Sequence, residues 1–513
     1  MAKLTTALPL AAAALDPRSG LPLYRQLYES LRAGILDGRL RPGARLPSTR
    51  ELASTLSVSR NTVMNAFEQL LAEGYLEGHV GSGTFVTRSL PEDTLHARAH
   101  GDGLRAHGAG RDSRQGRAAT HSLSRRGAEL ARSPASSAIS DGRARPFRPG
   151  TPALDKFPFE VWGRLAARHW RKPPPALLGY GEPAGHMPLR EAIATYLGTA
   201  RAVRCEPSQV IVTAGAQQAL DLAARVLLDP GDPVWIEDPG YLGARVALRG
   251  AGARLVPVPV DEEGLEVSAA EAVAPRARMC YVSPSHQYPL GVTMSLARRL
   301  QLIEWAAREG AWVLEDDYDS EYRYAGRPLA AMQGLDRGGR VIYLGTFSKV
   351  LFPALRLGYM VVPPDLASAF SNARGVLSRF SPTVDQAVLA DFINEGHFAR
   401  HIRRTRALYA TRQAALVEAV RKELRGLLEV EPDEAGIHLV GWLAEGADDR
   451  AASLAAERAG IDAQPLSSYT LEHRRRGGLV LGYAGYDERR IREGVRRLAA
   501  ALKSAGRPGF NKL

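Results

Sequence analysis

The sequence predicts two folded modules: a small, mostly helical module near the start, followed by a large α/β domain with a mostly parallel sheet. Three observations predict this architecture. At 513 residues the chain is too long for one ordinary hydrophobic core. Residues 20 to about 87 show helical periodicity and end in a glycine-tipped hairpin. From Pro146 onward, short apolar strands alternate with helical segments, as in parallel sheets with helical crossovers.

In the first module, apolar residues at four-residue spacing predict a helix that ends at Gly38 and Pro42. A short second helix, "STRELASTL", begins at Ser48 or Thr49 as its cap. After a turn, a third helix is expected from about Ser59 to Leu71. Its predicted apolar stripe consists of Val63, Phe67, Leu70 and Leu71. The segment "YLEGHVGSGTFV" then predicts a small hairpin.

Three helices and a hairpin in this order are typical of a winged helix-turn-helix. Arg60, Asn61 and Thr62 lie in the first turn of the third helix, which would enter the major groove of DNA. Arg50 and the wing at Gly81 to Gly83 would meet phosphates. The net charge of +12 suits a polyanionic partner. The alternatives are a protein-interaction bundle with solvated charges, and a charge excess that only aids solubility.

Residues 88–145 are rich in Gly, Ser, Ala and Arg and poor in large apolar residues, so we expect a flexible basic linker. Its r.m.s. reach would be roughly 40 Å. The predicted domains are therefore 1–87 for the DNA-binding module, 88–145 for the linker and 146–513 for the α/β domain.

The two cysteines, Cys205 and Cys280, lie far apart, which predicts neither a disulfide framework nor a metal site. No run of 18 apolar residues exists, so no membrane span is expected. The opening "MAKLTTALPLAAAALDP" has some features of a signal peptide, but a DNA-binding module follows it directly. We therefore expect a cytoplasmic protein.

Six apolar segments predict the strands of the second module. They are "QVIVTAG", "PVWIEDPG", "ARMCYVSPS", "WVLEDDYD", "RVIYLGTF" and "LGYMVVP". Several are followed by turns rich in Gly, Ser, Asp and Pro, and α/β proteins bind ligands at that edge of the sheet.

Lys349 follows one of these strands in "YLGTFSKVLFPALRLGY", among apolar residues and seven positions before Arg356. Burial or nearby positive charge makes a lysine amine a nucleophile near neutral pH, although most such lysines only extend their amine to water. Partners elsewhere favour a pyridoxal phosphate site with Lys349 as the Schiff-base lysine. Asp316 ends a strand and would face the ring nitrogen, and Tyr318 would reach the phenolic oxygen. The alternative is a strand end with solvated acids.

A strand-to-helix turn at Gly215, Ala216 and Gln217 offers backbone amides to a phosphate dianion. Thr346 and Arg356 flank the lysine and would complete that cradle. Tyr241, in "EDPGYLGAR", is a candidate to stack on the ring.

Two resemblances to known families cover nearly the whole chain. The string "LPSTRELASTLSVSRNTVMNAFEQLLAEGYLEGHVGSGTFV" resembles the DNA-binding domain of the GntR family. The order of the phosphate turn, "DPGY", "PSHQYPLG", "EDDY" and "SK" resembles fold-type I aminotransferases, as do "YGEPAGHMPLREAIATYL" and "GHFARHIRRTRALYATR". Together they resemble the MocR/GabR family of pyridoxal phosphate-dependent transcriptional regulators. On this resemblance the DNA contacts are Arg50, Ser59, Arg60, Asn61, Thr62 and Gly83.

The resemblance further implies a homodimer, because Tyr180 corresponds to a tyrosine that reaches the neighbouring subunit's cofactor phosphate. Two positions depart from the aminotransferase pattern. Val480, in "GLVLGYAGY", stands where an arginine usually binds the substrate carboxylate, and Tyr288 replaces the asparagine at the cofactor phenolate. We therefore expect a regulator that binds operator DNA and senses an amine, an amino acid or the cofactor itself. The alternative is a working aminotransferase that also binds DNA.

Overall fold

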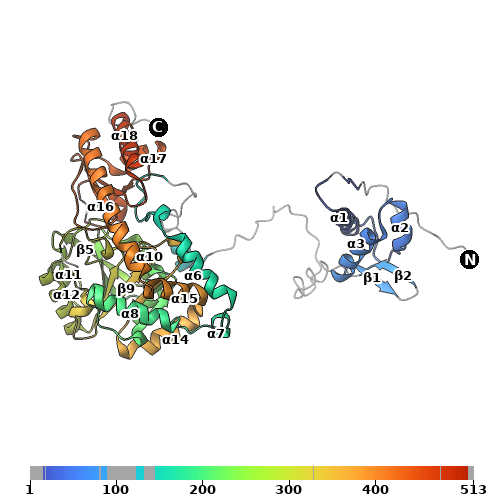
Figure 1. Ribbon diagram of the computed structural model, residues 1–513, viewed down its shortest axis with the longest axis horizontal. Coiled ribbons are helices and arrows are strands. Elements are labelled where there is room, and N and C mark those ends of the chain that lie inside the picture. The colour runs from blue at the N-terminus through green and yellow to red at the C-terminus, as the bar shows by residue number, and fades with distance from the viewer. Residues whose placement is uncertain are drawn as a thin grey trace, which may run out of the picture. The chain divides into compact units, whose positions relative to one another are not determined.

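The computed structural model describes residues 15–17, 19–79, 82–88, 123–131, 145–326, 329–473 and 475–505. The chain divides into two compact units, Met1–Thr120 and His121–Leu513. Each is described by itself below (Figure 1). In the described part of the chain, no helix has both the length and the apolar character needed to cross a membrane.

The first unit contains α1 (Leu23–Leu36), α2 (Thr49–Thr55) and α3 (Arg60–Ala72), followed by the strands β1 (Leu76–His79) and β2 (Gly83–Val86). The two strands pair in an antiparallel hairpin. The core includes Val63, Phe67 and Leu70 of the predicted stripe. Leu71 is instead 38% exposed, because one residue advances about 100° around a helix and Leu70 already faces the core.

The second unit is built on an eight-stranded sheet in the order β3-β10-β9-β8-β7-β4-β5-β6. Its strands are β3 (Val210–Thr213), β4 (Pro233–Asp238), β5 (Arg254–Asp261), β6 (Gly264–Leu265), β7 (Met279–Val282), β8 (Trp312–Asp317), β9 (Val341–Thr346) and β10 (Gly358–Val361). Pairing is parallel from β9 through β8, β7 and β4 to β5, whereas β10 is antiparallel to both neighbours. The prediction of a mostly parallel sheet is confirmed.

Helices cover both faces of this sheet, which explains why its strands are apolar throughout. On one face pack α9 (Ala216–Leu227), α10 (Leu242–Ala251) and α14 (Ala367–Ser378). A second core lies around α11 (Val267–Val273) and α12 (Leu296–Glu309), where Trp235 and Trp305 stack with ring centroids 3.8 Å apart. Further elements are α6 (Phe159–Arg171), α7 (Pro175–Leu178), α8 (Met187–Arg201), α13 (Met332–Leu335) and α15 (Thr383–Asn394).

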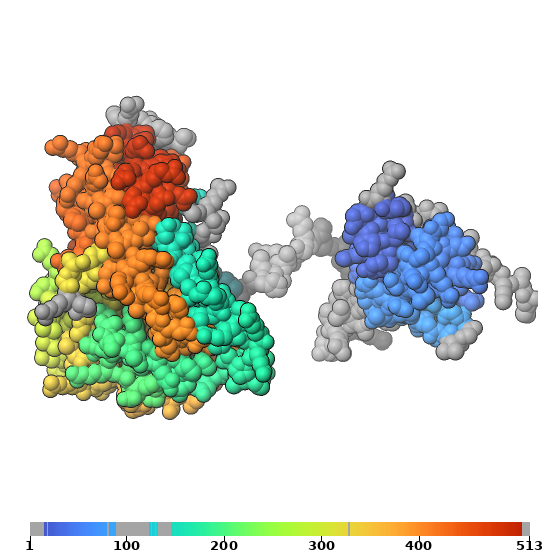
Figure 2. Space-filling view, viewed as in Figure 1, coloured from blue at the N-terminus to red at the C-terminus, as the bar shows by residue number. Residues whose placement is uncertain are grey.

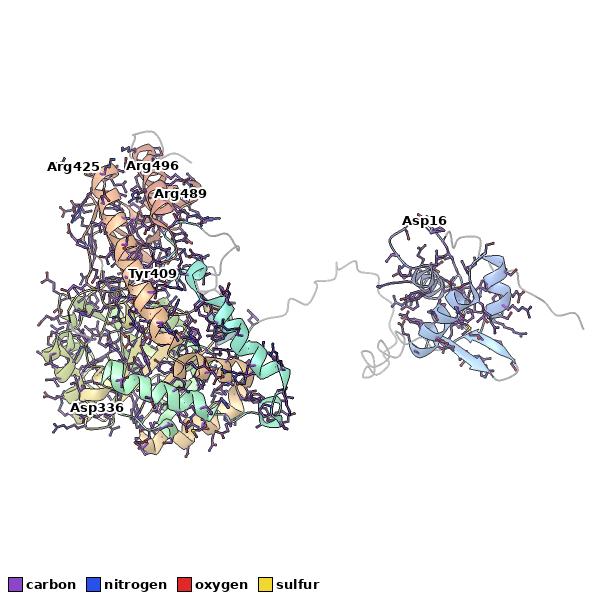
Figure 3. All side chains as sticks on the ribbon, viewed as in Figure 1. Asp16, Asp336, Tyr409, Arg425, Arg489 and Arg496 are labelled. Atoms are coloured by element: carbon purple, nitrogen blue, oxygen red, sulfur yellow. The ribbon has the colours of Figure 1, made fainter. Side chains whose placement is uncertain are left out.

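A smaller antiparallel sheet closes the unit, in the order β11-β12-β14-β13. Its strands are β11 (Leu428–Val430), β12 (His438–Leu443), β13 (Gln464–Pro465) and β14 (Gly478–Gly482), with helices α16 (His397–Glu423), α17 (Asp449–Arg458) and α18 (Glu488–Ala505). Helices α16 and α18 pack against each other, as their orange and red atoms show in Figure 2. Tyr409 of α16, labelled in Figure 3, accepts a 2.8 Å hydrogen bond from the backbone N–H of Ala153. This contact holds the start of the second unit against α16.

One helix lies within the stretch expected to be a linker. This helix, α5 (Arg125–Ala131), packs on α10 of the second unit. A methyl group added at Gly250 of α10 would lie 3.2 Å from Leu130. Seven residues are too few for a stable isolated helix, so this one depends on a surface that composition alone does not reveal. The boundaries 88 and 145 stay a prediction.

Candidate functional site

Lys349 lies in the turn that follows β9, and its amine contacts the beginning of the second unit. Its Nζ donates a 3.1 Å hydrogen bond to the carbonyl of Gly150. Gly150 has a left-handed φ of 72°, and a Cβ at this position would collide with Nζ. Desolvation lowers the pKa of Lys349 below its ordinary value, although the carboxylates of Asp319 and Asp316 oppose this shift. The lowered pKa makes the amine a better nucleophile at neutral pH.

Asp316, the penultimate residue of β8, is a buried carboxylate with one oxygen that has no partner in the described part of the chain. Tyr281 donates a 2.7 Å hydrogen bond to Oδ2, whereas Oδ1 has no hydrogen-bond partner among the described residues. Burial raises the pKa of Asp316 to about 6, so the group is mostly ionised at neutral pH. A buried oxygen without a partner is costly. A protonated pyridine nitrogen would satisfy it, and the site therefore fits pyridoxal phosphate.

The other acids of this strand end are also buried, so the alternative of solvated acids is wrong. Glu315 accepts hydrogen bonds from the backbone of Met332 and Gln333. Asp317 forms a 2.7 Å ion pair with Arg201, which is 4% exposed. Glu315 and Asp317 thus have their own structural partners. Oδ1 of Asp317, like Oδ1 of Asp316, has no hydrogen-bond partner among the described residues, but Asp317 is neutralised by the adjacent Arg201 guanidinium, whereas Asp316 has the hydroxyl of Tyr281 as its partner.

The predicted phosphate cradle is assembled at the N-terminus of α9. Gly215 caps this helix with a φ of 110°, and a Cβ there would lie 3.7 Å from Nη1 of Arg356. Ala216 is the first residue of the helix. The structure thus brings these three residues together at a helix N-terminus, which favours an anion. Thr346 lies at the end of β9, where its hydroxyl accepts a hydrogen bond from Ser348 N at 3.2 Å.

The side-chain amide of Gln217 donates a 3.0 Å hydrogen bond to the Gly243 carbonyl of α10. Its backbone amide lies in the first turn of α9, where it was predicted to meet phosphate. The neighbouring Tyr241 is the N-cap residue of α10 and lies partly buried near Asp316 and Arg356. Burial, reinforced by Asp316, raises the pKa of Tyr241 to about 12, so its hydroxyl stays protonated.

Tyr288 and Val480 belong to one apolar cluster, in which Val480 is fully buried. The hydroxyl of Tyr288 lies 3.0 Å from that of Tyr469, and its ring meets Tyr318 edge-on with centroids 5.9 Å apart. The other members are Val440, Leu466, Leu242, Leu290 and Trp442. The position predicted to correspond to the carboxylate-binding arginine is therefore apolar.

Tyr180 lies outside this apolar cluster and is 94% exposed, with its ring edge-on to Phe380.

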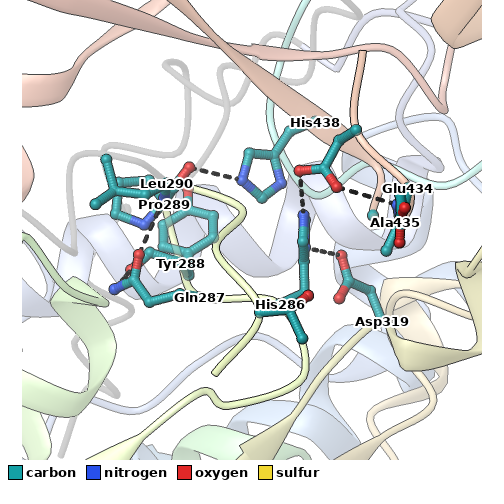
Figure 4. A network of polar contacts seen from close by, with 12 residues as sticks. His286, Gln287, Tyr288, Pro289, Leu290, Asp319, Glu434, Ala435 and His438 are labelled. Carbon is teal, nitrogen blue, oxygen red and sulfur yellow. Dashed lines mark hydrogen bonds and ion pairs between the residues drawn. The ribbon is translucent and has the colours of Figure 1, made fainter. Parts of the chain in front are cut away.

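Sequence reasoning missed a buried polar network shown in Figure 4. In it His286 lies between Asp319 and Asp433, and Tyr318 contacts the same ring. Ligand atoms of His286, Asp319 and His438 are close enough to hold a metal ion, although the ion pairs already occupy the imidazole nitrogens of His286. The string "PSHQYPLG" carried the only signal, a histidine beside a ligand-binding turn.

The DNA-binding candidates gather around the start of α3 in the first unit. Arg50, Ser59, Arg60 and Asn61 are exposed, and Thr62 is half-buried. Ser59 caps α3 by accepting a 3.0 Å hydrogen bond from Thr62 N. A first turn held in this way presents the side chains of Arg60 and Asn61 to a ligand.

The wing contributes exposed Gly83, whose φ of 109° requires glycine. A Cβ there would lie 3.0 Å from Nε of Arg45, a basic residue that sequence reasoning missed. Gly81 lies outside the described residues. The wing therefore places a guanidinium beside a glycine where backbone can approach phosphate closely.

Comparisons with known proteins identify the families of both units. Residues 23–86 match the family of bacterial regulatory proteins of the gntR type, and residues 150–498 match aminotransferase class I and II. The chain is 46% identical to the probable rhizopine catabolism regulatory protein MocR of Rhizobium meliloti, over 96% of this chain and 97% of that protein. It is 32% identical to the pyridoxine biosynthesis transcriptional regulator PdxR of Corynebacterium glutamicum, over 93% and 96%.

Among solved structures, the α-aminoadipate aminotransferase LysN of Thermus thermophilus, complexed with N-(5'-phosphopyridoxyl)-L-leucine, is similar with a TM-score of 0.65 and 33% identity. The match covers 70% of this chain and 92% of LysN. The residues around Lys349 and Asp316 fit the same cofactor, pyridoxal 5'-phosphate. The chain belongs to the MocR family of transcriptional regulators, in which a GntR-type DNA-binding domain is joined to a pyridoxal phosphate-binding domain of the aminotransferase class I and II fold.

Proposed function

We propose that the second unit is a sensor: an amine or amino acid, or the cofactor itself, binds at Lys349 and changes how the protein binds its operator. When bound, the cofactor supplies an aldehyde that condenses with amines. The residues of this chain would hold it in place. Asp316 would bind the ring nitrogen, Tyr318 the phenolic oxygen, and Tyr241 the ring face. Gly215, Ala216, Thr346 and Arg356 would bind the phosphate.

The apolar surroundings of Val480 carry the proposal. In an aminotransferase, a buried guanidinium holds the substrate carboxylate with two charge-assisted hydrogen bonds. Here the five residues of β14 are Gly, Leu, Val, Leu and Gly, and all are buried. Losing such a contact weakens binding by roughly 1.5–3 kcal/mol. Amines would thus reach Lys349, while α-amino acids would lack the anchor that turnover needs.

The proposal includes a homodimer. Tyr180 is almost fully exposed although it is a large aromatic residue, which suits a side chain that completes the phosphate site of a second copy. An effector that binds one dimer conformation more tightly would change the spacing of the two DNA-binding units. That change is limited by the difference in its affinity for the two conformations.

The experiment mixes the purified holo-protein with a panel of amines and amino acids, with and without an oxo-acid acceptor. We expect the cofactor's visible absorption to change with some of these ligands and new amino acid to form very slowly. Lys349→Ala is the control and should show no spectral response. Steady transamination at about 1 s⁻¹ or faster would contradict the sensor and favour the aminotransferase.

A second measurement links the pocket to DNA. Duplexes selected by the protein from a random pool supply an operator, and mobility shifts at fixed salt compare binding with and without each ligand that changes the spectrum. A ligand that alters the cofactor spectrum should also alter the affinity or the preferred half-site spacing. If every such ligand left both unchanged, the pocket would not regulate DNA binding.

A further inference from the structure

His286 is a buried ring held between two carboxylates (Figure 4), and it also contacts Tyr318. It follows β7 in the chain and is 2% exposed. Its Nδ1 lies 3.0 Å from Asp319 Oδ2, and its Nε2 lies 3.5 Å from Asp433 Oδ2. Ionised carboxylates only accept hydrogen bonds, so Nδ1 carries a hydrogen that Asp319 accepts. The Asp433 carboxylate, at ion-pair distance from Nε2, favours a second ring proton and hence a cationic ring.

The charges around the ring support this protonation state. The titratable groups that face it are Tyr318, Asp319, Asp433 and His438. Burial by itself lowers the pKa of His286, but Asp319 and Asp433 outweigh this and raise the pKa to about 10. Burial lowers the pKa of His438 to about 3, so His438 is neutral and donates Nε2–H to the Pro289 carbonyl.

Asp433 also reaches a cavity of about 140 Å³ between the turn at Pro289 and β12. Its side chain is 26% exposed. Burial tends to raise the pKa of Asp433, but the hydrogen bond and charge of His286 outweigh this and lower it. This carboxylate therefore stays charged and holds the imidazolium from the side away from Asp319.

The packing leaves room for an imidazole and little else. Gly436 has a φ of 93°, and a Cβ there would overlap Cε1 of His286. A Cβ at Gly291, where φ is 84°, would lie 3.3 Å from Nε2. Two glycines in left-handed conformations thus allow the backbone to approach the ring closely.

The charge of His286 determines the orientation of the Tyr318 hydroxyl. This hydroxyl lies 3.0 Å from Nδ1 of His286. A protonated Nδ1 cannot accept a hydrogen bond, so its single hydrogen is shared between Asp319 Oδ2 and the Tyr318 oxygen, and the hydroxyl hydrogen turns away from the ring. A neutral Nδ1 without hydrogen would instead accept a hydrogen bond from the Tyr318 hydroxyl.

We propose that His286 is a positively charged positioning residue that keeps the Tyr318 hydroxyl as a donor toward the cofactor's phenolic oxygen. The inference rests on the role proposed above for Tyr318. The inference also accounts for the absence of the usual asparagine at the phenolic oxygen. Tyr288 was predicted to stand at that position, but its hydroxyl contacts the hydroxyl of Tyr469 instead. A donor backed by a cation stabilises negative charge on the phenolic oxygen, and this favours loss of the proton from the lysine-bound cofactor.

The test records visible spectra of the full-length holo-protein across pH for His286→Gln, Tyr318→Phe and the double variant. In His286→Gln the pH midpoint of the spectral change should rise by about one unit, which is a tenfold gain in proton affinity. Because His286 acts through Tyr318, the double variant should match Tyr318→Phe alone. Nitrogen NMR of the cofactor-free protein should show one doubly protonated ring at about pH 8, below the His286 pKa of about 10, and His286→Gln should remove it.

The proposal would be overturned if the pH midpoint were unchanged in His286→Gln but raised in Tyr318→Phe. Additive effects of the two substitutions in the double variant would also overturn it. An unchanged midpoint in Tyr318→Phe would overturn the assignment of Tyr318 itself, and the proposal with it. If His286→Gln does not fold, Asp433→Asn is the alternative variant, because it removes the partly exposed carboxylate that favours the His286 cation. It should raise the pH midpoint by a smaller amount. Its matched control is Glu434→Gln, a neighbouring acid that is 65% exposed and pairs with Arg323. An equal midpoint in these two variants would contradict a role for the cation.

Discussion

Asp316→Asn should weaken cofactor binding and, at neutral pH, stabilise the cofactor-free second unit. The carboxylate ionises in a buried site with one oxygen unpaired, so its pKa rises from 3.8 to about 6. At 1.36 kcal/mol per pKa unit, this shift costs the folded state roughly 3 kcal/mol above pH 6. Asparagine carries no charge and still accepts the hydrogen bond from Tyr281, so most of that cost disappears in the variant.

The pH dependence follows from the sign of the shift. A carboxyl group with a raised folded-state pKa binds protons more tightly in the folded state, so it lowers stability as pH rises from about 4 to 6. The stability advantage of the variant should therefore be largest near pH 8 and about half as large near pH 5. Cofactor affinity should fall by about tenfold or more, because a charge-assisted hydrogen bond to the ring nitrogen contributes roughly 1.5–3 kcal/mol.

Urea unfolding followed by tryptophan fluorescence measures the stability. All six tryptophans lie between positions 162 and 442, so the signal reports on the second unit. Glu315→Gln is the matched control for cofactor affinity, since this adjacent carboxylate binds the backbone at Met332 and Gln333 instead of the pocket. A less stable Asp316→Asn at pH 8, or one that binds the cofactor as tightly as the parent protein, would refute the reasoning.

Three further outcomes are expected. Lys349→Ala should lose the borohydride-reducible cofactor while the circular dichroism spectrum stays unchanged; retention of reducible cofactor would identify another lysine. Arg60→Ala should weaken binding to the selected duplexes by about 1–3 kcal/mol and relax the sequence preference of the protein in mobility shifts. An unchanged sequence preference would place the recognition helix elsewhere. Ser59→Ala should destabilise α3 by about 0.5–2 kcal/mol, because the cap on Thr62 N is lost; amide hydrogen exchange in Arg60–Ala72 should then be faster, and unchanged rates would contradict the cap's contribution.

The sequence by itself determined the types of the two modules, because the evidence for them is local. Spacing of apolar residues and helix caps marked α1, α2 and α3. Six apolar segments marked six of the eight strands of the sheet. The strand β5 was missed because Pro257 and Pro259 interrupt its pattern, and β6 was missed because it has only two residues. Lys349 and Asp316 were recognisable because each lies close to the carboxyl end of a strand, and the carboxyl ends of parallel strands share one edge.

Tertiary structure alone decided which groups meet across long distances in the chain. Lys349 contacts Gly150 across 199 positions, and His286, which follows β7, meets Asp433 in the loop between β11 and β12. The packing of α5 on α10 is another contact between segments that are far apart in the sequence. Such contacts leave little trace in local periodicity, because each partner is placed by its own strand or turn and they become neighbours only when the layers pack. The charge of His286, and with it the direction of the Tyr318 hydroxyl, is a property of that packed arrangement.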